Sequence, residues 1–160
     1  MRAVSAIVST IIVIAVTVTV SVAAAFWSVD VTRAFTGVER LELVTAYADV
    51  ASSPSDGFNV TLIFRNAGSV AVSLDNVVLN EKPWTHYPTG TVHIFESNTA
   101  ALGEALSEAD LANHYQMVPG DEKSMVIWLK NGGVFTSGTS LGVTLHTSSG
   151  REYPKTVRLP

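Results

Sequence analysis

Four histidines are the residues in this sequence best suited to ligating a metal ion or exchanging a proton near neutral pH: His86, His93, His114 and His146. No two of them are four residues apart, and none belongs to a His-Glu-x-x-His motif, which would place two ligands on one helical face. The chain of 160 residues contains no Cys, so thiolate-based zinc and iron–sulfur sites are excluded. We therefore expect neither a metal site nor a bound cofactor.

Acidic side chains gather at one place, where Glu104, Glu108 and Asp110 fall in a segment of helical character. A solvated helix face explains such a cluster better than a general acid and base do. No serine has an evident histidine and aspartate partner for nucleophilic catalysis. We therefore predict no catalytic residues and a chain that is not an enzyme. The net charge of −4, without any cluster of Lys or Arg, also excludes a nucleic-acid partner.

The sequence contains a single Asn-x-Ser/Thr sequon, formed by Asn59, Val60 and Thr61. Its surroundings over residues 58–66 predict a strand, so Asn59 must face solvent if it carries a glycan. Asn59 is therefore a candidate for N-glycosylation.

These residues follow an N-terminal segment that is uncharged from residue 3 to residue 29. About 20 apolar residues in a helix cross a bilayer core, so this segment is long enough to span a membrane. Phe26 and Trp27 are side chains typical of a membrane interface, and Arg2 favours an orientation with the N-terminus in the cytoplasm. Residues 30–160 carry 9 basic and 14 acidic side chains, so an acidic domain is expected outside the cell.

Small and hydroxyl-bearing residues recur at helical spacing along this segment, and such residues let helix backbones approach closely. The spacing alone leaves two interpretations open: a single-pass anchor, or a helix that packs against copies of itself. The helix is expected to continue to Thr36 and to stop at Gly37. Under the second interpretation the predicted packing residues are Ala6, Thr10, Thr17, Ser21, Ala25 and Ser28.

The motif Arg2-Ala3-Val4-Ser5, with the apolar run that follows to residue 12, resembles the N-terminus of archaeal type IV pilins. The resemblance implies a class III signal peptide, residues 1–3, that a prepilin peptidase removes by cutting between Ala3 and Val4. It further implies that residues 4–36 first anchor the subunit in the membrane and then enter a filament core, delivered by a pilus assembly platform. Val8, the fifth residue after the cut, agrees with archaeal members, whereas bacterial pilins have Glu there.

Residues 38–160 change from a helical to a two-residue period and predict an all-β head domain. A kink is expected near Asp75 and Asn76, and Ser107 is expected to cap a helix over residues 108–115, within a longer helical segment that begins at residue 98. The expected fold class is α+β: a long N-terminal hydrophobic helix, then a β-sandwich with a short helical insertion. This head resembles the immunoglobulin-like heads of archaeal pilins and archaellins. Strands are expected at residues 40–48, 58–66, 70–79, 91–95, 124–129, 141–147 and 153–159, the last two forming a hairpin.

We predict a structural subunit of an archaeal type IV pilus, a homo-oligomeric extracellular filament used for surface adhesion. A second hypothesis is a membrane-anchored extracellular β-sandwich that binds a sugar or peptide. A third is an archaellin-type subunit of a motility filament, although archaellins usually open with a Gly-rich, Phe-containing helix that is not found here. The candidate aromatic residues of the second hypothesis are Trp84, Tyr87, Trp128 and Tyr153.

Overall fold

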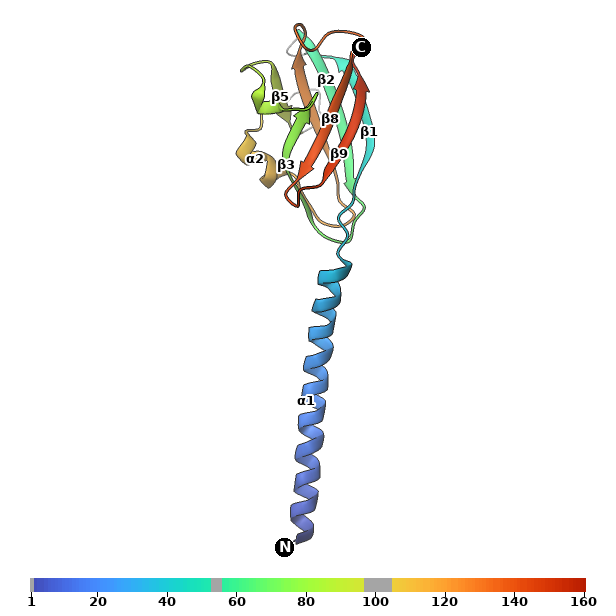
Figure 1. Ribbon diagram of the computed structural model, residues 1–160, viewed down its shortest axis with the longest axis vertical. Helices are drawn as coiled ribbons and strands as arrows, with labels where there is room; N and C mark the ends of the chain where they lie inside the picture. Colours follow the sequence, from blue (N-terminus) through green and yellow to red (C-terminus); the bar gives the residue numbers. More distant parts are fainter. Residues whose placement is uncertain (1, 53–55, 97–104) are drawn as a thin grey trace. The chain divides into compact units, whose positions relative to one another are not determined.

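The computed structural model describes residues 2–52, 56–96 and 105–160 (Figure 1). The chain forms two compact units, Met1–Gly37 and Val38–Pro160. The first unit is a single helix, and the second is a head built mainly of strands.

Helix α1 runs over Arg2–Thr36 and contains neither Gly nor Pro. Its many Val, Ile and Thr residues have weak helix propensity in water. A helix nevertheless satisfies its backbone hydrogen bonds within the segment, so it is favoured wherever water is absent. The helix ends at the residue before Gly37, as predicted.

In the part of the head that the structure describes, nine strands accompany one α-helix and one 3-10 turn. The helical elements are η1 (Trp84–His86) and α2 (Glu108–His114). The strands are β1 (Leu41–Val50), β2 (Gly57–Asn66), β3 (Val72–Leu79), β4 (Lys82–Pro83), β5 (Val92–Phe95), β6 (Gln116–Met117), β7 (Glu122–Lys130), β8 (Ser140–Thr147) and β9 (Glu152–Arg158).

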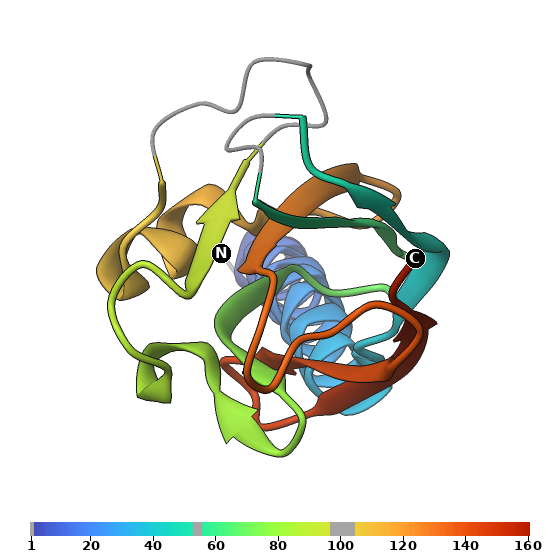
Figure 2. The same ribbon diagram turned by 90° about the horizontal axis from the view of Figure 1, so that it is seen from above.

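The strands form two antiparallel sheets that face each other (Figure 2). One sheet has the order β1-β2-β7-β5, and the other has the order β4-β3-β8-β9, with β6 paired to the start of β3. Alternate residues point into the space between them: on β2, Phe58, Val60, Leu62 and Phe64 are buried. Each large apolar side chain buried in this way stabilises the head by about 1.5–3 kcal/mol relative to leaving it exposed. The predicted α+β class, with a sandwich of strands after a long helix, is confirmed.

Two strands depart from regular pairing. β3 shifts register between Leu74 and Asn76, which confirms the predicted kink. β1 shifts register between Leu43 and Thr45, and Val44 between them is 53% exposed. An inserted residue of this kind bends a strand and increases its twist.

The helical insertion is shorter than residues 98–115. Within the described residues, 105–107 are not helical and α2 begins at Glu108, while residues 97–104 lie outside the description. The N–H of Leu106 donates to the carbonyl of Ile94 at 2.8 Å, which keeps Leu106 beside β5. Ser107 caps α2, as predicted, because its side chain accepts a hydrogen bond from the N–H of Asp110. The elements β4, β6 and η1 were not predicted, because two or three residues carry no periodic signal.

Candidate assembly interface

Helix α1 exposes apolar side chains on every side. All of residues 5–30 are exposed within the unit, and Ile11 and Phe26 reach 61% and 70%. Among the described residues, one helical stretch, Ser5–Thr32, is long and apolar enough to cross a membrane. Such a surface is unfavourable in water, so the helix requires lipid or other apolar helices around it.

All hydroxyl groups of α1 other than that of Ser5 are bonded within the helix. Eight of them donate to the carbonyl oxygen four residues earlier, at 2.7 to 2.9 Å. These hydroxyls therefore need no water, and residues 3–29 carry no charge, so the helix can enter lipid or a protein interior at low desolvation cost. The donors are Ser9, Thr10, Thr17, Thr19, Ser21, Ser28, Thr32 and Thr36.

The predicted packing residues lie on one side of α1 and form a small-residue stripe. At about 100° per residue, all six fall within about 100° of arc. The four hydroxyl groups among them are turned back onto the backbone, and Ile7 and Ile14 fall within the same arc. The stripe consists of Ala6, Thr10, Thr17, Ser21, Ala25 and Ser28. The opposite side, the bulky side, carries Val8, Ile12, Val16 and Phe26, together with the smaller Ser5, Thr19 and Ala23.

Arg2, Ala3 and Val4 lie at the start of α1. The structure does not describe their side chains. The cut between Ala3 and Val4 falls inside the helix and stays a prediction.

Asn59 lies on β2, on the face of the sheet that points away from the core, opposite Asp49 on β1 and Trp128 on β7. Its side chain is half-buried, and its Oδ1 has no hydrogen-bond partner. Thr61 of the same sequon is 5% exposed. A glycan on the folded head would therefore require Asn59 to turn outward, and glycosylation there stays a prediction.

Within residues 2–52, 56–96 and 105–160, no group of three or more His, Cys, Asp or Glu could hold a metal ion. Two histidines instead each face one glutamate. Nδ1 of His114 lies 3.1 Å from Oε2 of Glu96, and Nε2 of His146 lies 3.3 Å from Oε1 of Glu152. The other two histidines lie in η1 and β5.

A Gly-x-Ser-x-Gly pattern, which the sequence analysis did not predict as a site, occurs at residues 138–142. In hydrolases this pattern occupies a turn from a strand into a helix. Here Ser140 begins β8 and pairs with Arg158 in the β8–β9 hairpin. His146 lies at the far end of the same strand, about 20 Å away at about 3.3 Å per residue. The pattern therefore does not assemble a catalytic triad with His146.

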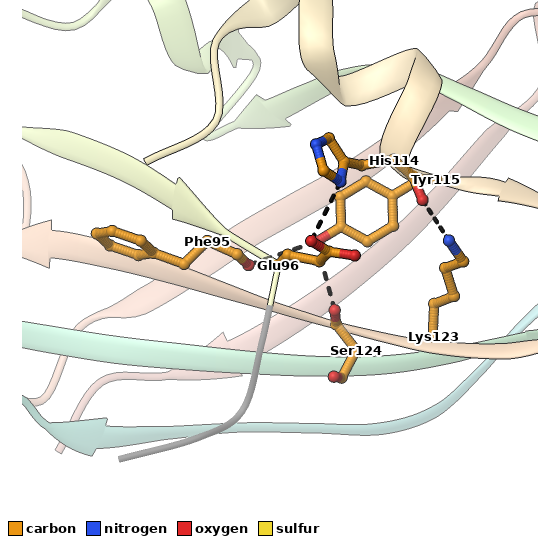
Figure 3. Close-up of polar contacts among 6 residues, drawn as sticks. All are labelled: Phe95, Glu96, His114, Tyr115, Lys123 and Ser124. Atoms are coloured by element: carbon orange, nitrogen blue, oxygen red, sulfur yellow. Dashed lines mark hydrogen bonds and ion pairs between the residues drawn. The ribbon is translucent and has the colours of Figure 1, made fainter. Parts of the chain in front are cut away.

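Polar contacts surround Tyr115, the residue that follows α2 (Figure 3). Its ring is fully buried, and its hydroxyl lies 3.4 Å from the carbonyl oxygen of Phe95 and 3.3 Å from that of Ser124. Burial, reinforced by the charge of Glu96, raises the pKa of this hydroxyl well above its ordinary value, so it stays protonated and can donate. Lys123 donates to the last carbonyl of α2. These contacts tie α2 to β5 and β7, and a hydroxyl buried this deeply serves the fold rather than a substrate.

The aromatic residues of the binding hypothesis are packed against other parts of the head. Trp84, Tyr87 and Tyr153 are half-buried against the main core cluster, and Trp128 is buried in a second cluster with Ala51, Phe95 and Val126. The hydroxyl of Tyr87 donates to the carbonyl of Leu79 at 2.7 Å. This placement favours core packing over an exposed platform for a ligand.

No family model and no curated protein matches the chain. Among solved structures, the apo PCuAC domain from PmoF1 is 13% identical with a TM-score of 0.46, over 77% of this chain and 98% of that one. The archaellum periplasmic stator protein FlaG from Sulfolobus acidocaldarius is 16% identical with a TM-score of 0.46, over 74% and 99%. A chain of the archaeal flagellum of Methanospirillum hungatei strain JF1 is 15% identical with a TM-score of 0.41, over 99% and 92%. At these identities and TM-scores the likeness is one of general architecture and assigns no function.

Proposed function

We propose that this protein is a structural subunit of an archaeal type IV pilus and that it polymerises through α1 into an extracellular filament used for surface adhesion. The same helix holds the subunit in the membrane before assembly. The proposal assigns the chain no catalytic activity. It is carried by the hydroxyl groups of α1, eight of which are bonded inside an exposed, apolar helix.

A bilayer and a bundle of identical helices make one demand in common, which is that no polar group be left unpaired. A bilayer and a helix bundle differ in the shape of helix surface that packs well against them. Lipid chains adapt to any apolar side chain, whereas close packing of helix backbones requires small residues along one side. Helix α1 combines a surface that is uncharged over residues 3–29 with the small-residue stripe, which supports a rod that moves from lipid into a filament core.

The N-terminal residues support a pilin in particular, since Arg2-Ala3-Val4-Ser5 resembles the processing site of archaeal pilins. N-terminal sequencing of filaments sheared from cells is expected to give Val4 as the first residue. Electron microscopy of cell-surface filaments that never contain this chain would contradict the proposal. A deletion strain that stops swimming but still adheres would point to an archaellin instead.

Replacing Ala3 with arginine is expected to block removal of residues 1–3. The archaeal pilins that this N-terminus resembles have Gly or Ala at the residue just before the cleavage site. The variant should remain in the membrane at its full mass and form few or no filaments, as judged by mass spectrometry and electron microscopy. Ala3→Gly is the matched control and should be processed and assembled normally. Normal filaments from Ala3→Arg would show that a cut at this position is not required.

A further inference from the structure

One carboxylate of the head is buried close to the point at which the chain leaves α1. Glu39 lies three residues after Thr36, the last residue of α1, and is 9% exposed. Ser149 donates a hydrogen bond to its Oε2. The other carboxylate oxygen, Oε1, is covered and has no hydrogen-bond partner. Half of this carboxylate is therefore unsatisfied inside the fold.

The charge of Glu39 has no compensating charge beside it. In the part of the chain whose side chains the structure describes, the ion pairs are made by Glu42, Glu96 and Glu152, and none includes Glu39. An uncompensated buried carboxylate is destabilising, and one hydroxyl donor offsets only part of the cost. A water molecule could bond to Oε1 but carries no charge. A cation would satisfy the free oxygen and the charge together.

Hydroxyl oxygens of the turn between β8 and β9 lie beside the carboxylate of Glu39. Oγ1 of Thr147 is 3.1 Å from Oγ of Ser149, and this Oγ in turn contacts Glu39. Thr147 is 2% exposed, whereas Ser149 is exposed. The group of oxygens therefore has a covered side and a side that is open to solvent.

The turn that supplies the hydroxyls is fixed by its own backbone. The N–H of Ser148 donates to the carbonyl of Ser73 on β3 at 2.9 Å, and the N–H of Gly150 donates to the carbonyl of Thr147 at 2.8 Å. Gly150 has a φ of +81°, which glycine adopts without strain. The residues on either side of Glu39 both accept hydrogen bonds at 2.8 Å from the loop after β2. The oxygens are thus held in place before any ion binds, which lowers the entropy cost of binding.

We propose that Glu39, Thr147 and Ser149 form a calcium-binding site that joins the first residues of the head to the β8–β9 turn. Calcium takes about six to eight oxygen ligands in a flexible arrangement, whereas magnesium demands a strict octahedron and keeps its water. The carboxylate and the two hydroxyls supply part of this set, and water on the open side supplies the rest. The absence of nitrogen and sulfur among these groups favours calcium over zinc or copper.

The site differs from those that the sequence excluded. That expectation concerned His and Cys ligands, whereas this site consists of oxygen atoms and contains a single carboxylate. One carboxylate implies weak binding, with a Kd of about 0.1–1 mM, the range of extracellular calcium modules. The inference goes beyond the proposed function, because it depends on the fold of the head and is measured on the unassembled chain.

Thermal unfolding of the head, followed by near-UV circular dichroism, tests the site. The full chain is used in a non-ionic detergent, because a chain that begins at Val38 would place an α-amino group next to Glu39. After treatment with a chelator, calcium at about 10 mM is expected to raise the Tm by about 4–10 °C over sodium chloride of equal ionic strength. The same concentration of magnesium should raise the Tm far less.

Glu39→Gln keeps the size of the side chain and removes its charge, so the rise in Tm with calcium should disappear. Glu42→Gln is the matched control, because Glu42 is an exposed carboxylate at the start of β1, and it should keep the full rise. Equal rises in the parent and in Glu39→Gln would place any calcium elsewhere and overturn the proposal. A parent whose Tm does not respond to calcium would overturn it as well.

Ser149→Ala keeps the test decisive if Glu39→Gln does not fold. Loss of one ligand should raise the calcium concentration at half of the Tm rise several-fold, and an unchanged concentration would contradict the site. None of these results depends on filament formation. The calcium site and the proposed function can therefore fail separately.

Discussion

Replacing Thr17 and Ser21 together with leucine is expected to remove filaments while the protein stays in the membrane. Both residues lie on the small-residue stripe, and both hydroxyls are bonded to carbonyls within α1, at 2.7 Å. Leucine is more favourable than Thr or Ser in lipid, so membrane insertion should be kept or improved. Two larger side chains on the stripe hold neighbouring backbones apart, so close packing is lost along the contact.

The measurement compares filament yield by electron microscopy with subunit retention in isolated membranes. The matched control is Ile12→Leu with Val16→Leu, two changes of similar chemistry on the bulky side of α1. We expect a loss of filaments of roughly tenfold or more in the stripe variant, and a far smaller loss in the control. Equal yields in the two double variants would show that the stripe does not form the contact between rods.

Replacing Asn66 with alanine is expected to destabilise the head by about 3–5 kcal/mol. Asn66 is fully buried, and its side chain makes three hydrogen bonds to backbone groups. Its Oδ1 accepts from the N–H of Gly68 at 3.0 Å, and its Nδ2 donates to the carbonyls of Val70 and Met117. Alanine leaves all three groups without this partner in a space that water enters poorly, so the free energy of unfolding falls.

Urea unfolding of residues 38–160 measures this effect, since the main core cluster lies wholly within that unit. Asn113→Ala is the control: Asn113 is exposed on α2, and its amide lies 3.5 Å from the carbonyl of Ala109. It should change the free energy of unfolding by no more than about 0.5 kcal/mol. If Asn66→Ala stays within about 1 kcal/mol of the parent, Asn66 does not hold the loops together as described.

The sequence was most informative where one periodic signal continues over many residues. The helical span to Thr36 and the β8–β9 hairpin follow from hydrophobic pattern and from glycines at the turns. The kink near Asp75 was predictable because polar residues interrupt an apolar strand. By contrast, β4 and β6 are strands of two residues that form by pairing with β3. Two residues are too few to show the alternation of apolar and polar side chains that predicts a strand.

The candidate site likewise has features that the sequence predicts and features that it does not. The stripe on α1 is predictable because it depends on spacing along one helix. The importance of Asn66 is not, because its partners Val70 and Met117 come together only after the strands pair. The surroundings of Asn59 depend on Trp128, which lies far along the chain on the neighbouring strand. Contacts of this range are set by tertiary packing rather than by local pattern.

The register shift in β1 also affects whether the β1 edge of one head can pair with a strand of another. β1 is an edge of its sheet, and a regular edge presents unpaired peptide groups on which a strand of another molecule can add. The irregularity between Leu43 and Thr45 interrupts that row and twists the strand, so an added strand would lose its hydrogen bonds there. At this edge, heads brought close together in the proposed filament would thereby be protected from joining into amyloid-like ladders, while ordered contacts through other surfaces would remain available.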